Sequence, residues 1–382
     1  MMHRRASVTR FGGILLVMTL WPGCAWWEGQ SKPEWIDGVS AAYPSNQYLL
    51  GVGQADDRTV AEDQAYAALS RIFKAEVSAQ AKDWESYLVI EQRGQSREER
   101  RLTLDSLTRV STDKVLENVR IVDRWYDSKK RLHYALAGMH RPQAESAFME
   151  RMTELDRSIQ EQVDTSHRAT DKLTKVRELR RASRNLVLRE TYHADLRVIR
   201  PSGQGTAAAY RVNELTHELE QFLATNLVTA VGVTGDHAEP VQGALTEGLL
   251  REGLQVASRS AGAGGGGGPV PELMVQGVVR VFPIDVRDPH FKYVRWCSDF
   301  EVIDLASQRV IGALSQGGKE GHLTEREATA KVVRVMQQEF SSHVASAIAA
   351  HVYGESDLPA QASPPAGCPR DGMVLKPAAV TH

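Results

Sequence analysis

The sequence predicts an α+β protein in which two small α/β domains are joined by a long helical arm or helical hairpin. Two observations predict this class. Short apolar runs, bounded by Gly, Pro and Asp, recur in residues 46–141 and in residues 206–353, as expected for strands mixed with helices. Between these regions, Pro142 and Pro201 enclose a long stretch without Gly or Pro, which predicts a predominantly helical segment.

The composition excludes several classes of protein. The 382 residues include 46 Lys and Arg and 48 Asp and Glu, for a formal net charge of −2. This balance provides no broad basic surface, and no second long apolar run follows the N-terminal one. We therefore expect neither nucleic acid as a partner nor a protein that crosses a membrane several times.

The N-terminus has the three parts of a bacterial lipoprotein signal. It begins with a basic segment, continues with about ten apolar residues and ends in Gly23 and Cys24. We therefore expect residues 1–23 to be a signal peptide and Cys24 to be the lipid attachment site. Palmitate is the expected acyl group.

Two residues of this signal depart from the usual pattern. Trp21 and Pro22 stand before Gly23, which leaves an ordinary secretory peptide or an uncleaved anchor as alternatives. The apolar run is shorter than the ~20 residues that a spanning helix needs. Ala25 favours an outer-membrane location, with the domains in the periplasm. Residues 24–45 lack periodicity and are interpreted as a tether.

The first domain is expected over residues 46–141. Gly51 and Gly53 are interpreted as the end of its first strand, and alanines at helical spacing predict a closely packed helix after it. The expected elements are a strand at 48–53, a helix at 59–77, a strand at 88–90, a helix at 102–110 and a strand pair at 115–126 and 132–139.

The helical arm is expected over residues 142–200. It carries two apolar stripes separated by the polar residues 164–171, so a hairpin and a continuous rod are both open. Because a single narrow apolar stripe must find a partner, the arm is a candidate for self-association. The stripes are Phe148, Met152, Leu155, Ile159 and Val163, and then Leu173, Val176, Leu179, Leu186 and Leu188.

The second domain is expected over residues 206–353, and a Pro, Ala and Ser-rich tail over 354–382 is predicted to be disordered. Thr324 and Glu327 predict the cap of the last helix. The expected elements are helices at 212–223, 241–250 and 326–351, and strands at 227–233, 254–257, 273–282, 293–304 and 308–315.

Cysteine use predicts no disulfide framework. Besides Cys24, the chain has Cys297 in an apolar strand and Cys368 in the Pro-rich tail. A bridge between these two is open, but their surroundings favour a buried thiol and a free thiol.

No pattern predicts a catalytic, cofactor or metal site, so we expect no enzyme. The glycine tract 262–268 is followed by prolines rather than by Lys and Ser, which favours a flexible loop over a phosphate-binding loop. Carboxylates at strand ends are interpreted as solvated turn residues, namely Asp285, Asp288, Asp299, Glu301 and Asp304. Histidines without metal-binding spacing are interpreted as surface or packing residues, namely His217, His237, His322, His343 and His351.

A basic run lies on the helical arm. We interpret it as a solvated helix face, and contact with anionic lipid, lipopolysaccharide or peptidoglycan carboxylates is the alternative. Trp26, Trp27 and Trp35 are candidates for the membrane interface. The basic residues are Lys172, Lys175, Arg177, Arg180, Arg181 and Arg184.

Residues 33–145 resemble the LPP-type lipoproteins, a family of about 20 kDa bacterial outer-membrane proteins. The resemblance rests on Pro33, Trp35 and Ile36, on Tyr43 and Pro44, on the strand 48–53 with its alanine-rich helix, and on the closing strand 134–141. Gly138, Met139 and His140 depart from the family's usual apolar spacing.

Residues 222–353 resemble a second envelope module. It is the small α/β domain of penicillin-binding-protein activator lipoproteins, curli-secretion lipoproteins and the flagellar H-ring protein. The resemblance rests on the strand 227–233, on 275–279, and on 299–304 followed by 308–311. The order of the two modules is similar to that of the flagellar H-ring protein.

These resemblances imply a non-enzymatic scaffold or assembly factor for an outer-membrane or flagellar-type complex. The alternative is a lipoprotein regulator that binds and activates a peptidoglycan synthase. Either function implies the membrane and one or more envelope proteins as partners.

Overall fold

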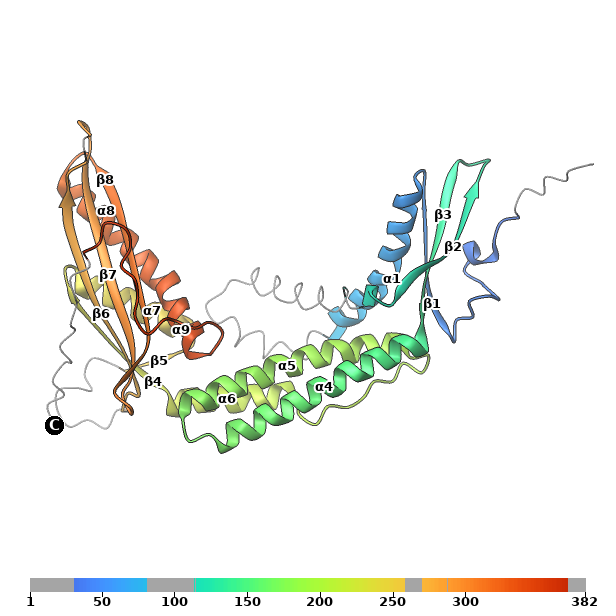
Figure 1. Cartoon of the computed structure of the whole chain (residues 1–382), viewed down its shortest axis with the longest axis horizontal. Helices are drawn as coiled ribbons and strands as arrows, with labels where there is room; N and C mark the ends of the chain where they lie inside the picture. The colour runs from blue at the N-terminus through green and yellow to red at the C-terminus, as the bar shows by residue number, and fades with distance from the viewer. Residues whose placement is uncertain (1–30, 81–112, 114, 258–269, 287, 370–382) are drawn as a thin grey trace, which may run out of the picture.

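The computed structural model describes residues 31–80, 113, 115–257, 270–286 and 288–369 (Figure 1). It confirms an α+β fold with two sheets and a helical hairpin between them. The two sheet domains rise from the same side of the hairpin, one at each end (Figure 1). The expected strand at 88–90 and helix at 102–110, the signal peptide and the glycine tract lie outside the described residues.

The first domain is a three-stranded antiparallel sheet of order β1-β3-β2 with one helix on it. The expected strand pair is confirmed as a hairpin, although its first strand begins at Val119 rather than at residue 115, where the chain is helical. Its elements are β1 (Tyr48–Ala55), α1 (Arg58–Gln80), β2 (Val119–Asp127) and β3 (Leu132–His140).

Gly51 and Gly53 lie within β1 and face α1, so their interpretation as a strand end is wrong. A Cβ atom on Gly53 would lie 2.1 Å from the carbonyl oxygen of Ala61, and one on Gly51 would lie 2.6 Å from that of Ala65. The glycines therefore allow the backbones of β1 and α1 to approach closely.

Part of the predicted tether packs against the sheet face opposite α1. Trp35, in the short helix η1 (Glu34–Asp37), is 4% exposed and donates from Nε1 to Oδ2 of Asp123 at 2.7 Å. The Tyr43 hydroxyl donates to the carbonyl oxygen of Val122 at 3.0 Å. The tether is therefore shorter than predicted, and Trp35 is a core residue rather than a candidate for the membrane interface.

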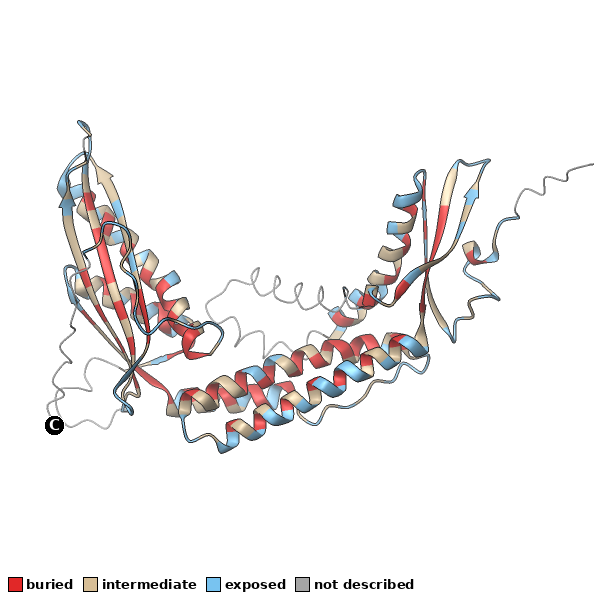
Figure 2. Cartoon of the chain, viewed as in Figure 1, coloured by how far each residue is buried: buried red, intermediate tan, exposed pale blue. Residues whose placement is uncertain are grey.

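The arm is a hairpin of α4 (Arg141–Arg168) and α5 (Lys172–Ile199), which decides between the two alternatives. Asp171 caps α5 by accepting from the backbone N of Thr174 at 2.8 Å. The first stripe shares a core with Leu186 and Leu188 of the second stripe, whereas Leu173, Val176 and Leu179 pack into the core of the second domain. Figure 2 shows buried positions along the line where the helices meet. Helix α6 (Val212–Asn226) also packs on α5. Because the stripes are covered within the chain, they no longer require a second copy.

Arg189 fastens the middle of the hairpin. Its side chain is fully buried and pairs with Asp156 of α4 and with Glu190, each at 3.0 Å. It also donates to the carbonyl oxygen of Ala207, in the segment that returns along the hairpin to α6, at 3.0 Å. One guanidinium therefore joins three segments of chain.

The second domain is a five-stranded sheet of order β5-β4-β6-β7-β8 with helices on one face. Strand β4 is parallel to β5 and β6, and β6, β7 and β8 are antiparallel. The last predicted helix contains one π-helical segment (Phe340–Val344). The other elements are β4 (Val228–Gly235), α7 (Ala238–Arg251), β5 (Gln255–Val256), β6 (Leu273–Ile284), β7 (Lys292–Asp304), β8 (Arg309–His322), α8 (Glu325–Glu339) and α9 (Ala345–Val352).

Residues 355–369 form a strap around β8, so the prediction of disorder is wrong for this part of the tail. The backbone N of Ala313 on β8 donates to the carbonyl oxygen of Pro359 at 2.7 Å. Cys368 then forms a disulfide with Cys297 on β7, with 5.8 Å between their Cα atoms. The favoured prediction of two separate thiols is therefore wrong, because sequence spacing could not show that the strap crosses the sheet at Cys297.

Candidate functional site

Each domain is fixed to the hairpin by arginines. At the first domain, Arg141 donates to the carbonyl oxygens of Ser45 at 2.9 Å and Val198 at 2.8 Å, and burial lowers its pKa. Arg200 pairs with Glu145 at 2.8 Å, and Arg197 pairs with Glu76 of α1 at 3.4 Å. The contacts of Arg141 to Ser45 and of Arg197 to Glu76 join the first domain to the hairpin, whereas the Arg200–Glu145 pair joins the end of α5 to α4.

At the second domain, the predicted basic run makes the contacts. Arg177 donates to the carbonyl oxygens of His351 at 2.9 Å and Val352 at 3.3 Å, at the end of α9. Arg180 is 7% exposed, pairs with Glu355 and lies 4.2 Å over the ring of Tyr353. The interpretation of the run as a solvated face is therefore wrong for these two arginines.

The other members of the run differ in their surroundings. Lys172 pairs with Glu272 at the start of β6, and Lys175 lies 4.9 Å over the ring of Phe222 on α6. Arg181 and Arg184 remain exposed, as the sequence predicts. Some residues of the basic run therefore bind the second domain and α6, whereas Arg181 and Arg184 face solvent.

His351 lies buried where the strap begins. It is 4% exposed, and its Nδ1 accepts from the backbone N of Leu358 at 3.1 Å. Burial, together with the charge of Arg177, lowers its pKa and favours the neutral ring that this hydrogen bond requires. His351 is therefore a packing residue, as predicted.

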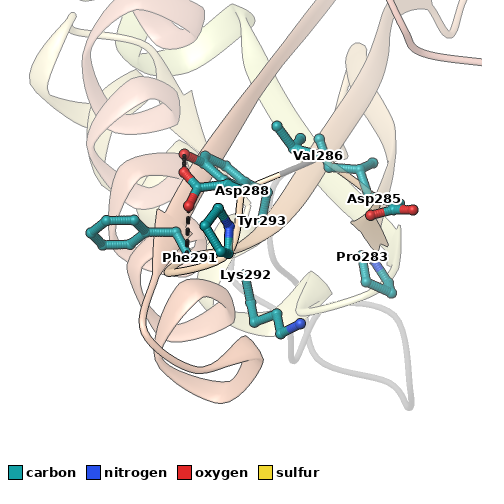
Figure 3. A pocket seen from close by; sticks show the side chains of 9 residues that line it. Pro283, Asp285, Val286, Asp288, Phe291, Lys292 and Tyr293 are labelled. Carbon is teal, nitrogen blue, oxygen red and sulfur yellow. Dashed lines mark hydrogen bonds between the residues drawn. The ribbon is translucent and has the colours of Figure 1, made fainter.

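A cavity of about 700 Å³ opens at the free end of the second domain, within the turn between β6 and β7. Asp288 organises this turn by accepting from the backbone N of His290 at 2.9 Å. It also accepts from the backbone N of Phe291 at 3.2 Å and from the Tyr293 hydroxyl at 3.0 Å (Figure 3). These bonds lower the pKa of Asp288, and donation to Asp288 raises that of Tyr293.

Phe291 points away from the lining residues Pro283 and Asp285 (Figure 3) and is 43% exposed. Leu323, which is 64% exposed, follows β8 at the same end, because Lys292 and His322 form the last pair of the β7–β8 ladder. We call Phe291 and Leu323 the apolar tip. The sequence analysis missed them, since nothing in the sequence brings these two positions together before the strand register is known.

The structure separates the predicted carboxylates. Asp285 and Asp288 lie at the apolar tip, whereas Asp304, at the opposite end of β7, caps the next turn by accepting from the backbone N of Ala306 at 2.8 Å. Asp299 and Glu301 lie within β7 and share one of its faces, so their interpretation as solvated turn residues is wrong. Burial and the charge of Asp299 raise the pKa of Glu301. Within the described residues, no group of three or more His, Cys, Asp or Glu side chains could hold a metal ion.

Comparison with known proteins identifies the first domain. Residues 33–140 match the family model of the LPP20 lipoproteins. This LPP20 region begins at the segment that packs Trp35 on the sheet and ends with β3, so it coincides with the three-stranded domain. The match confirms the resemblance to LPP-type lipoproteins. The resemblance of residues 222–353 to other envelope modules stays a prediction.

Solved structures provide two further likenesses. A secreted protein of Helicobacter pylori aligns at 11% identity over 80% of this chain and 98% of its own, with a TM-score of 0.40. A minor lipoprotein of Acinetobacter baumannii aligns at 10% identity over 34% of this chain and 95% of its own, with a TM-score of 0.24. No curated protein matches the chain. In the described residues, no helix is both long and apolar enough to span a bilayer. Cys24 lies outside these residues.

Proposed function

We propose that the protein is an outer-membrane lipoprotein, anchored through Cys24 with its domains in the periplasm, and that it acts as a non-enzymatic scaffold for an envelope complex. The LPP20 match supports a lipoprotein, and the signal pattern supports attachment at Cys24. Ala25 supports the outer membrane as the destination.

The observation that carries the scaffold role is that one spacer is bonded to a domain at each of its ends. A 28-residue helix such as α5 is about 42 Å long. Arg141 and Arg197 join its first-domain end to that domain, and Arg177 and Arg180 join the other end to the second domain. A rigid spacer holds two binding surfaces at a set separation, which lets two weak contacts to one complex add together.

The test is recovery of partners from crosslinked, detergent-solubilised envelopes. We would compare the wild type with Arg177→Ala/Arg180→Ala, which loosens the second domain, and with Arg181→Ala/Arg184→Ala, which removes two exposed arginines from the same helix. Cys24→Ala tests the anchor separately. The size of each purified complex is measured by light scattering.

A scaffold predicts a large assembly that is lost in Arg177→Ala/Arg180→Ala and in Cys24→Ala but kept in the matched control. Equal recovery by both arginine variants would contradict a role for the fixed separation. A monomeric protein recovered with a single peptidoglycan synthase would instead support the regulator alternative.

A further inference from the structure

The free ends of the two domains share an unusual composition. In the first domain, the end of β2 carries Tyr126, which is 49% exposed, and the turn that follows carries exposed Lys129, Lys130 and Arg131. In the second domain, the apolar tip lies beside exposed Lys292. Figure 1 shows both ends on the same side of the hairpin. Exposed Asp285, Glu325 and Glu327 also lie at the second of these ends. Two separated surfaces that carry exposed aromatic side chains beside lysines therefore face one direction.

Both turns are held by an aspartate that faces its own backbone. Asp127 accepts from the backbone N of Lys129 at 3.0 Å and of Lys130 at 3.1 Å. Asp288 plays the same part for His290 and Phe291. Each carboxylate is thereby engaged within its turn, and the residues after it are presented outwards in a fixed conformation.

We propose that both turns rest on the surface of an anionic lipid bilayer, with Phe291 and Leu323 inserted among the lipids. The inference rests on the proposed membrane attachment. Phe291 in the β6–β7 turn and Leu323 after β8 lie at the same end of the sheet, and exposed apolar side chains grouped in this way indicate a contact surface. Their exposed position at the free end of the domain fits insertion into a bilayer, where aromatic rings and lysines are favourable at the interface and basic residues attract anionic headgroups.

A bilayer also fits the position of the chain's N-terminal segment. The first described residues lie against the first domain, so a lipid at Cys24 would hold this domain near a membrane. Because the hairpin fixes the second domain, the apolar tip would reach the same surface. The hairpin would then bridge the two contacts without lying on the lipid itself.

The test uses the mature chain without its lipid, residues 25–382, sedimented with vesicles of phosphatidylethanolamine and phosphatidylglycerol. We expect the wild type to bind. Phe291→Ser/Leu323→Ser should lower the partition coefficient at least about tenfold, because two apolar side chains no longer leave water. The matched control is Leu250→Ser/Val270→Ser, which changes two exposed apolar residues that precede β5 and β6 in the same domain.

The second contact is tested by charge. Lys129→Glu/Lys130→Glu should weaken binding to phosphatidylglycerol vesicles, and added salt should reduce the difference from the wild type. Arg181→Glu/Arg184→Glu makes the same change in net charge on the hairpin and should bind as the wild type does.

Three results would overturn the proposal. They are no sedimentation of the wild type, wild-type binding by the tip variant, or equal losses in a variant and its matched control. Thermal unfolding of every variant establishes that it is folded. Because partner recovery is measured with the lipidated protein, failure of vesicle binding is distinguishable from failure of the scaffold role.

Discussion

The disulfide between Cys297 and Cys368 joins a central strand to the strap and closes a loop with a sequence separation of 71 residues. Loop closure restricts the unfolded chain, so its loss should cost about 4 kcal/mol of unfolding free energy by the chain-entropy estimate. We expect Cys368→Ser to unfold at lower urea concentration than the wild type. Dithiothreitol should lower the urea midpoint of the wild type to that of Cys368→Ser and leave the midpoint of Cys368→Ser unchanged. A wild-type midpoint that does not respond to the reductant would contradict this prediction.

Arg180→Ala should destabilise the second domain by about 1–2 kcal/mol, because it removes the ion pair to Glu355 and the contact with Tyr353. Arg181→Ala, one position along and exposed, should stay within about 0.5 kcal/mol of the wild type. Urea unfolding monitored by circular dichroism compares the two, and equal effects would mean that Arg180 does not fasten the joint.

Glu190 should make the hairpin sensitive to acid. Burial raises its pKa, but the hydrogen bond with His193 and the charge of Arg189 outweigh burial, so the folded-state pKa lies below the ordinary value of 4.5. Its contribution is therefore present above about pH 4.5 and is lost as the pH falls through the lowered value.

The variant Glu190→Gln tests this sign. At pH 7 its free energy of unfolding should be about 1–2 kcal/mol lower than that of the wild type. The difference in unfolding free energy between the variant and the wild type should become smaller when unfolding is measured at pH 3. A gap that widens on acidification would show that the folded-state pKa is raised instead.

Gly53→Ala should destabilise the first domain by more than about 2 kcal/mol, since the new Cβ would meet the backbone of α1. Gly243→Ala offers the opposite case. Gly243 lies in α7 with nothing within 4 Å of a Cβ, so alanine should stabilise the protein by up to about 1 kcal/mol. Calorimetric melting temperatures should move in opposite directions, and a tolerated Gly53→Ala would contradict the close approach.

Periodicity predicted the elements whose signals are local. The strands expected at 273–282 and 293–304 correspond to β6 and β7, and the strand expected at 132–139 corresponds to β3. Even the polar break at 164–171 marks the hairpin turn. Each of these signals depends on residues a few positions apart, so the sequence alone displays it.

Long-range contacts could not be read in this way. The positions of Trp35 against Asp123, of Cys368 against Cys297 and of Phe291 beside Leu323 depend on how distant segments meet. The basic run illustrates the same limit, because Arg177 and Arg181 look alike in sequence and differ only in which side of α5 they occupy. Residue type and spacing therefore indicated which residues are charged, but not which of them contact another segment of the chain.

The strap also determines how this protein avoids joining its neighbours. Strand β8 is an outermost strand, and outermost strands with open backbone groups can template stacking between molecules. The strap takes up the backbone N of Ala313 and brings Pro359, Pro364 and Pro365, which have no amide hydrogen to offer a further strand. Another molecule would thus find fewer open backbone groups on β8 to pair with, and the C-terminal segment would protect the protein against aggregation.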